Sequence, residues 1–183
     1  MCGIIGWKSN TQRVNENIIR KMADAIAHRG PDGEGFYYSN DGSLCLAHKR
    51  LAIIDPENGH QPMKSLDEEL VITFNGAIYN FLELRRELVS LGHPIKSYSD
   101  TEVLIYAYKQ WGEKCLDRLN GMFSFVIHDK RKKILFGARD RLGEKPFYYF
   151  YNKKEFIFAS EIKAILASGV VKASLNNESL HEY

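Results

Sequence analysis

The stretch MFSFVIHDKRKKILFGA, residues 122–138, indicates the fold class of this chain. Two apolar runs, Met122–His128 and Ile134–Ala138, flank the basic run Lys130–Lys133. Apolar runs of this length are typical of strands, and a short charged segment between them is typical of a solvated turn. Parallel strands need a crossover of about a dozen residues or more, so this connection joins antiparallel strands. The stretch therefore predicts a β-hairpin.

Similar runs extend along the chain in both directions. Turn-forming residues at 40–42 (NDG) and 152–154 (NKK) predict two further antiparallel hairpins. The chain is therefore expected to be rich in antiparallel sheet. The runs that we predict as strands are Gly3–Trp7, Phe36–Tyr38, Leu44–His48, Leu51–Ile54, Leu70–Phe74, Met122–His128, Ile134–Ala138, Phe147–Tyr151 and Phe156–Ser160.

Three segments have the apolar spacing of helices. The first begins near Asn15, and the second spans about Phe81–Leu91 and ends at Gly92. The third begins at Ser99, where Ser99 and Glu102 have the spacing of a capping box. Because the last two helices lie between two groups of strands, the sequence predicts an α+β fold built in layers.

Length and composition indicate an ordinary globular chain. Its 183 residues favour one domain with at most a short appendage. The 25 Lys and Arg residues nearly balance 23 Asp and Glu, so nucleic acid is not an expected partner. No run approaches the roughly 18 apolar residues of a transmembrane helix, and the first residues lack a signal-peptide pattern. We therefore expect a cytoplasmic protein with no membrane partner.

The cysteines and histidines show no disulfide or metal-binding pattern. Cys2, Cys45 and Cys115 are odd in number and widely spaced, so we expect reduced thiols. The 6 histidines include no His-Glu-x-x-His motif and no pair four residues apart. The sequence therefore predicts no metal site.

Cys2 is the first candidate for catalysis. Removal of Met1 makes Cys2 the N-terminal residue and places a free α-amine beside its thiol. An α-amine has a pKa of about 7.7–8.0, so it can accept the thiol proton near neutral pH. One residue can then supply both the nucleophile and the base. The alternative is a buried cysteine in a strand.

Three further positions could complete an active site for an amino-acid amide. Asn75 and Gly76 could present a side-chain amide and a backbone N–H to an oxyanion, although Asn-Gly is also a common hairpin turn. Arg50 could bind a carboxylate, or it could be an exposed salt-bridge residue. Asp100 could bind an ammonium group, or it could be a helix cap.

Two polar segments are predicted to have structural roles. Residues 28–33 (HRGPDG) combine glycine and proline in an arrangement typical of a turn. Residues 139–146 (RDRLGEKP) are predicted to be a charged loop that positions its neighbours.

Seven short motifs in register resemble the glutaminase domain of asparagine synthetases. This domain is a class II glutamine amidotransferase of the N-terminal nucleophile (Ntn) hydrolase superfamily. The resemblance covers nearly the whole chain and is specific because all the motifs occur in order. They lie at residues 1–6 (MCGIIG), 28–33 (HRGPDG), 50–55 (RLAIID), 74–80 (FNGAIYN), 99–103 (SDTEV), 121–125 (GMFSF) and 158–164 (FASEIKA).

The resemblance implies a four-layer α/β/β/α sandwich of two antiparallel sheets. It also implies that Cys2 attacks the side-chain amide of L-glutamine, so that ammonia leaves first and water then releases glutamate. The roles implied for the other site residues are an oxyanion hole formed by Asn75 and the Gly76 N–H, and binding of the glutamine α-carboxylate by Arg50 and of its α-ammonium by Asp100. Leu51 and Ile53 are implied to line the same pocket.

The resemblance also implies a larger parent protein. Residues 1–168 correspond to the amidotransferase domain, and residues 169–183 to a linker and the start of a C-terminal synthetase domain. ATP and Mg are implied only for that second domain, so we expect no cofactor in this chain. Ammonia would pass to an activated acceptor, usually aspartate, although another carboxylate could serve. Formation of a homodimer stays open.

One position departs from the family pattern. The residue after Asn-Gly is usually a glutamate that faces the substrate ammonium, and here it is Ala77. We therefore expect weaker glutamine binding. Ala77 and the unprocessed Met1 also motivate an alternative, a catalytically silent domain that serves docking or regulation. An acylase of the same superfamily is a third alternative, which would not need Arg50 and Asp100 to bind a free amino acid.

Overall fold

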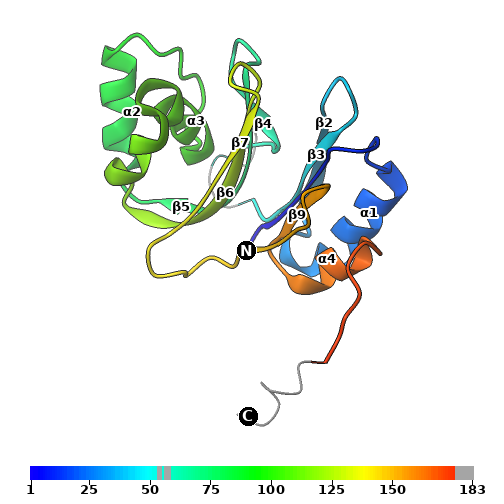
Figure 1. The fold of residues 1–183 in the computed structure, drawn as a ribbon. Coiled ribbons are helices and arrows are strands. Elements are labelled where there is room, and N and C mark those ends of the chain that lie inside the picture. Colours follow the sequence, from blue (N-terminus) through cyan, green and yellow to red (C-terminus); the bar gives the residue numbers. More distant parts are fainter. Residues whose placement is uncertain (53–54, 56–58, 176–183) are drawn as a thin grey trace.

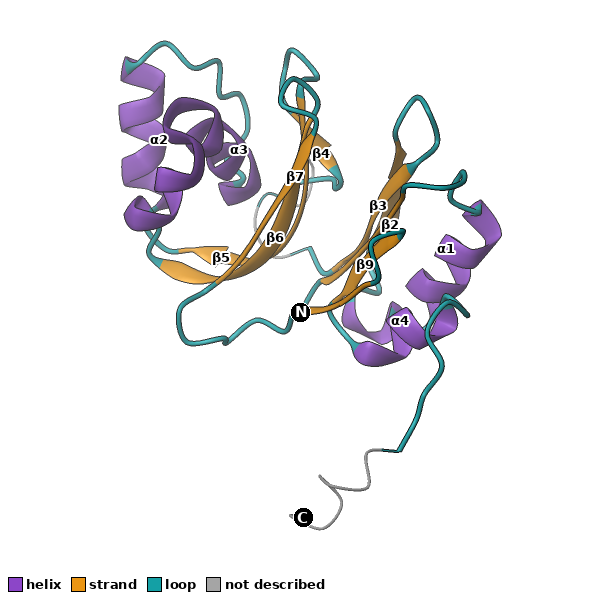
Figure 2. Cartoon of the chain, in the orientation of Figure 1, coloured by secondary structure: helices purple, strands orange, loops and turns teal. Residues whose placement is uncertain are grey.

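The computed structural model describes residues 1–52, 55 and 59–175 of the chain. Its elements form four layers, in which two sheets pack face to face and a pair of helices covers each outer face (Figure 1). In Figure 2 the strands form the middle of the molecule and the helices its two outer sides. The predicted layered α+β fold with two antiparallel sheets is confirmed.

The two sheets differ in size, and all of their strand pairs are antiparallel. The first has the order β2-β3-β1-β9-β8, and the second has the order β4-β5-β6-β7. The strands of the first sheet are β1 (Gly3–Ser9), β2 (Gly33–Tyr38), β3 (Leu44–Arg50), β8 (Tyr148–Tyr151) and β9 (Glu155–Ala159). Those of the second are β4 (Met63–Lys64), β5 (Leu70–Ile78), β6 (Gly121–Asp129) and β7 (Ile134–Arg139). All three predicted hairpins are present, as β2–β3, β6–β7 and β8–β9.

The three predicted helices are present, but the predicted capping box is formed only in part, because Glu102 accepts the Lys96 and Ser97 N–H groups and not the Ser99 N–H. They are α1 (Glu16–Asp24), α2 (Phe81–Ser90) and α3 (Asp100–Trp111). The Asn15 side chain accepts hydrogen bonds at the start of α1, and the Ser99 side chain does so at the start of α3. The sequence did not predict α4 (Ile162–Ala167), the two-residue β4 or two 3₁₀ segments, Ala27–Arg29 and Gly112–Arg118. Each of these is too short or irregular to show a clear period.

The predicted strand Leu51–Ile54 is wrong at its first two residues, because β3 ends at Arg50. Gly3 is the last residue of β1 to pair with β3, so Leu51 has no ladder partner there. The Leu51 N–H instead donates to Cys2 Sγ at 3.4 Å, and the Ala52 N–H donates to Asp32 at 2.9 Å. Side chains thus replace a neighbouring strand, and the rest of the predicted strand lies outside the described residues.

Successive side chains of β5 point alternately to two cores, one under α2 and α3 and one between the two sheets. Ile72, Phe74 and Ile78 pack under α2 and α3, whereas Val71 packs between the two sheets. Residues two apart in a strand share a face. Asn75 and Ala77 therefore lie on the face that looks toward the other sheet.

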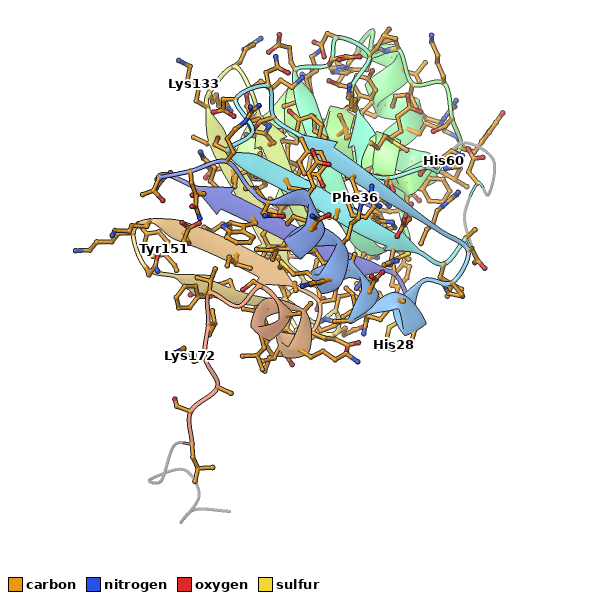
Figure 3. All side chains as sticks on the ribbon, turned by 90° about the vertical axis from the view of Figure 1, so that its right-hand side faces the viewer. His28, Phe36, His60, Lys133, Tyr151 and Lys172 are labelled. Carbon is orange, nitrogen blue, oxygen red and sulfur yellow. The ribbon has the colours of Figure 1, made fainter. Side chains whose placement is uncertain are left out.

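Figure 3 looks onto the face where α1 and α4 cover the five-stranded sheet. Phe36 of β2 packs against this core, and the Arg20 guanidinium lies 4.8 Å from its ring centroid. The exposed side chains of His28 and His60 lie far apart in this view (Figure 3). Within the described ranges, no three His, Cys, Asp or Glu residues are grouped to hold a metal ion, and no helix has the length and hydropathy to cross a membrane.

Candidate active site

One cavity of about 240 Å³ lies where β1, β3, β5 and the start of α3 meet. It brings together every proposed site residue except Ile53, which lies outside the described residues. A cavity of this size suits a small ligand. Its lining residues are Met1, Cys2, Arg50, Leu51, Gly59, Gln61, Phe74, Asn75, Gly76, Ala77, Ser99, Asp100, Thr101, Met122 and Lys145.

Cys2 lies one residue before β1, and its side chain is half-buried. Its Sγ lies 3.5 Å from the Leu51 carbonyl oxygen and accepts the Leu51 N–H. Burial raises the pKa of the Cys2 thiol, against the lowering effects of the Leu51 N–H, the terminal ammonium and Arg50. Among the described residues, hydrogen bonds to Sγ come only from Leu51. The thiol therefore needs a base to become a nucleophile.

The segment 28–33 does more than form the predicted turn. Residues 27–29 are a 3₁₀ segment, from which Arg29 Nε donates to the Cys2 carbonyl oxygen at 2.9 Å. Arg29 also forms an ion pair with Glu161 at 3.0 Å. Arg29 thus holds the backbone of Cys2. No local signal in the sequence marks this role, because the contact spans 27 residues.

Asn75 and Gly76 lie inside β5 and pair with Ser124 and Phe123 of β6, so their interpretation as a hairpin turn is wrong. Asn75 is only 2% exposed, and its Nδ2 has no hydrogen-bond partner in the described part of the chain. A buried donor without an acceptor costs about 1–3 kcal/mol. The Asn75 Nδ2 group can therefore donate a hydrogen bond to an oxygen of a bound ligand.

The backbone of β5 points a second donor in the same direction. Alternate residues of an antiparallel strand direct their polar groups to the same edge. Ile72 pairs with β4 on the edge away from β6, and the Phe74 and Ile78 N–H groups donate there to Gln61 and Asp100. Gly76 has the same parity, so its N–H points to this edge, into the cavity. A Cβ on Gly76 would lie 2.3 Å from the Met122 carbonyl oxygen, so only glycine fits.

Asp100 and Arg50 place an anionic and a cationic group at the cavity. Asp100 is the first residue of α3 and is not its cap, because Ser99 takes that position. The Asp100 carboxylate accepts the Ile78 N–H at 3.0 Å, and burial raises the pKa of Asp100 to about 6. Arg50 is 8% exposed, so it is not an exposed salt-bridge residue, and its Nη2 donates to the Asp55 carbonyl oxygen at 2.8 Å.

Gln61 and Lys145 are among the lining residues that were not predicted. Lys145 is 6% exposed, and its Nζ lies 3.4 Å from the Met1 sulfur. It belongs to the predicted charged loop, in which the Asp140 carboxylate accepts the N–H groups of Glu144 and Lys145. The loop therefore positions its neighbours as predicted, and it also places an ammonium group at the cavity.

The sequence matches the glutamine amidotransferase domain family over residues 1–183. The chain belongs to this family. An asparagine synthetase [glutamine-hydrolyzing] of Bacillus subtilis is 43% identical over the whole chain, which spans 30% of that protein. A putative asparagine synthetase of Methanocaldococcus jannaschii is 41% identical over the whole chain, which spans 39% of that protein. The resemblance to asparagine synthetases is confirmed, and the chain spans about a third of these relatives.

Two solved structures share the fold of this amidotransferase domain. Glutamine phosphoribosylpyrophosphate amidotransferase from B. subtilis superimposes with a TM-score of 0.78 over 92% of the chain and 44% of that structure, at 22% identity. The allosteric regulatory enzyme of purine biosynthesis gives the same TM-score and identity, over 92% of the chain and 43% of its own. At this identity the likeness bears on the fold alone, which is the predicted Ntn hydrolase type.

Proposed function

We propose that this amidotransferase domain hydrolyses L-glutamine to glutamate and ammonia in the cavity, with Cys2 as the nucleophile. The observation that carries the proposal is the buried, unpartnered Asn75 Nδ2 in a cavity shared with Cys2, Arg50 and Asp100. A tetrahedral oxyanion needs donors of this kind. A free amino acid needs one cation and one anion for its α-groups.

The first half of the reaction forms a thioester. After removal of Met1, the Cys2 α-amine accepts the thiol proton, and the sulfur attacks the side-chain carbonyl carbon of glutamine. The carbonyl oxygen becomes an oxyanion, which accepts hydrogen bonds from Asn75 Nδ2 and the Gly76 N–H. As the C–N bond breaks, the α-ammonium of Cys2 returns its proton to the leaving nitrogen, which departs as ammonia.

The second half of the reaction releases glutamate. A water molecule gives a proton to the Cys2 amine and attacks the thioester, and the same two donors stabilise the second oxyanion. The C–S bond breaks, the sulfur recovers a proton and glutamate leaves. The Arg50 guanidinium binds the α-carboxylate and Asp100 binds the α-ammonium throughout. Leu51 and Ile53 complete the pocket wall in this proposal.

The test of this proposal compares two N-termini. Protein whose Met1 removal is verified by intact mass is expected to release glutamate from L-glutamine. Insertion of a lysine between Met1 and Cys2 retains the methionine and turns the Cys2 nitrogen into an amide, which is expected to lower kcat by about 10²–10⁴-fold. Glutamate is measured with a coupled dehydrogenase. Equal rates for the two forms would show that the α-amine is not the base.

A silent docking domain is the second candidate function. Met1 lines the cavity and its sulfur contacts Lys145, and an unprocessed chain has no free amine at Cys2. Absence of glutamate release from folded, Met1-free protein would favour this candidate. Activity on acyl amides without an α-carboxylate would instead favour an acylase.

Ala77 gives a further expected result. A hydrogen bond to a charged group contributes about 1.5–3 kcal/mol. Since Ala77 lines the cavity beside Asn75, Ala77→Glu is expected to lower the KM for glutamine by about 10–150-fold and to change kcat little. Ala77→Gln has the same size without the charge and serves as the control. An unchanged KM in Ala77→Glu would contradict a missing contact to the substrate ammonium.

The parent protein extends this proposal. We propose that residues 1–168 form the glutaminase domain and that residues 169–183 lead into a synthetase domain, where ATP, Mg and an acceptor such as aspartate would bind. The support is that the relatives are named asparagine synthetases and that the chain spans 30% of one and 39% of another. Of this proposed linker and domain start, residues 176–183 lie outside the described residues. Such a protein would act in the cytoplasm.

A further inference from the structure

We propose that Gln61 is a positioning residue that fixes the donor-bearing end of β5 relative to the start of α3, an inference that rests on the proposed glutaminase function. Gln61 lies in the segment between β3 and β4, and it lines the cavity. It acts through the residues on either side of the site.

The Gln61 carboxamide contacts both halves of the site. Its Oε1 accepts the Phe74 N–H at 2.6 Å, and its Nε2 donates to Thr101 Oγ1 at 3.3 Å. Phe74 immediately precedes Asn75, and Thr101 immediately follows Asp100. One side chain therefore joins the neighbour of the oxyanion donor to the neighbour of the ammonium-binding carboxylate.

The topology of the sheet explains why β5 needs this side chain. β4 pairs only with Val71 and Ile72, so no strand of the described residues lies beside the edge of β5 beyond them. The two backbone polar groups of Phe74 point to this edge and are held by side chains instead. Gln61 accepts the N–H, and His48 Nε2 of the other sheet donates to the carbonyl oxygen at 3.1 Å.

The His48 side chain and the Gln61 backbone are both closely packed. His48 is buried, and burial lowers its pKa to about 4, so the neutral imidazole donates through Nε2. The backbone of Gln61 packs against β2, where a Cβ on Gly35 would lie 2.0 Å from the Gln61 carbonyl oxygen. The backbone of Gln61 thus packs against β2, while its side chain joins β5 to α3.

Loss of the Gln61 acceptor is expected to affect the chemical step more than substrate binding. Without it, the Phe74 N–H loses its partner and the backbone carrying the Gly76 N–H is free to shift. A misplacement of about 1 Å can cost a factor on the order of 10² in rate. The α-groups of the substrate would bind Arg50 and Asp100, whereas the hydrogen bonds of the Gln61 side chain go to Phe74 and Thr101.

The experiment uses Met1-free protein and three variants, Gln61→Met, Thr101→Val and Gln110→Met. Gln110 is an exposed residue of α3 that pairs with His93, so its variant controls for the glutamine-to-methionine change. The readouts are kcat, the melting temperature, exchange of the Phe74 amide hydrogen, and inhibition by L-norvaline, which has the α-groups but no side-chain carbonyl. Thr101→Val keeps the acceptor for Phe74 and removes only the anchor of Gln61.

Gln61→Met is expected to lower kcat by about 10–100-fold, to speed Phe74 exchange, and to change the norvaline inhibition constant by less than about threefold. Thr101→Val is expected to lower kcat by a smaller factor, and Gln110→Met to leave it unchanged. Equal losses of kcat and norvaline binding, or an unchanged kcat in folded Gln61→Met, would overturn the positioning role. If Gln61→Met does not fold, an unchanged kcat in Thr101→Val overturns it. No hydrolysis by the parent chain would overturn the proposed function and this role together.

Discussion

Cys2→Ala is expected to abolish glutamine hydrolysis, with a loss of kcat on the order of 10⁴–10⁶-fold. The substitution removes the sulfur that would form the thioester, and no neighbouring group can replace it. Among the described residues, the only hydrogen bonds to Sγ involve the Leu51 backbone. Glutamate release by Met1-free protein is the measurement, since the α-amine of residue 2 is then present in both proteins.

Cys45→Ala is the matched control for this substitution. Cys45 is a fully buried free thiol of β3, opposite Trp7 rather than at the cavity, and burial raises its pKa to about 12. Its loss is expected to lower stability and to leave kcat near that of the parent. Iodoacetamide followed by mass mapping is expected to label Cys2 first and Cys2→Ala not at all. Labelling of Cys45 at the rate of Cys2 would contradict the burial described here.

Asp100→Asn is expected to raise the KM for glutamine by at least about 10²-fold while raising the stability of the fold. Asp100 is the only carboxylate among the described residues that line the cavity, so its loss leaves the substrate ammonium without a counter-charge. Breaking a buried ion pair costs about 3–5 kcal/mol. Asparagine keeps an oxygen that can accept the Ile78 N–H.

The stability gain follows from the sign of the pKa shift. Burial raises the pKa of Asp100 from 3.8 to about 6, so the folded state binds the proton more tightly than the unfolded state. Stability therefore falls as the pH rises from 3.8 to 6, by about 3 kcal/mol in total. Asn has no ionised form, so Asp100→Asn is expected to melt higher than the parent above pH 6 and equally below pH 4.

The same pKa predicts the pH dependence of substrate binding. In the parent chain the KM for glutamine is expected to rise as the pH falls below 6, because protonated Asp100 cannot pair with an ammonium group. In Asp100→Asn the KM is expected to stay flat over this range. Thermal melts from about pH 3.5 to 8 and kinetics from about pH 4.5 to 8 measure the two effects, with exposed Asp24→Asn as the control. A lower melting temperature for Asp100→Asn at pH 8 would show that the carboxylate stabilises the fold.

Local patterns predicted most of the fold, because hairpin turns and helix caps are decided within a few residues. Ser99 as a cap and the turn at 130–133 are examples. The apolar run at 51–54 predicted a strand that is absent at Leu51 and Ala52. A strand also needs a neighbouring strand, and β1 pairs with β3 only as far as Lys49. No local pattern reports where a partner strand ends.

The site was predictable only in part. The position of Cys2 after Met1 marks it as a candidate nucleophile, and the seven motifs supplied the roles proposed for Asn75, Arg50 and Asp100. Gln61 and Arg29 escaped because their roles depend on contacts 13 or more residues away in sequence. A single sequence does not show which distant backbone group a glutamine or an arginine will reach.

The alternation of β5 restricts where this domain can tolerate insertions and deletions. Loss or gain of one residue before Asn75 would turn its carboxamide toward α2 and α3 and would turn the Gly76 N–H toward β6. The three hairpin turns, at 40–42, 130–133 and 152–154, all lie at the end of the sheets opposite Cys2. Length variation among descendants of this domain therefore belongs in those turns, while the number of residues in the strand that carries Asn75 has to stay the same.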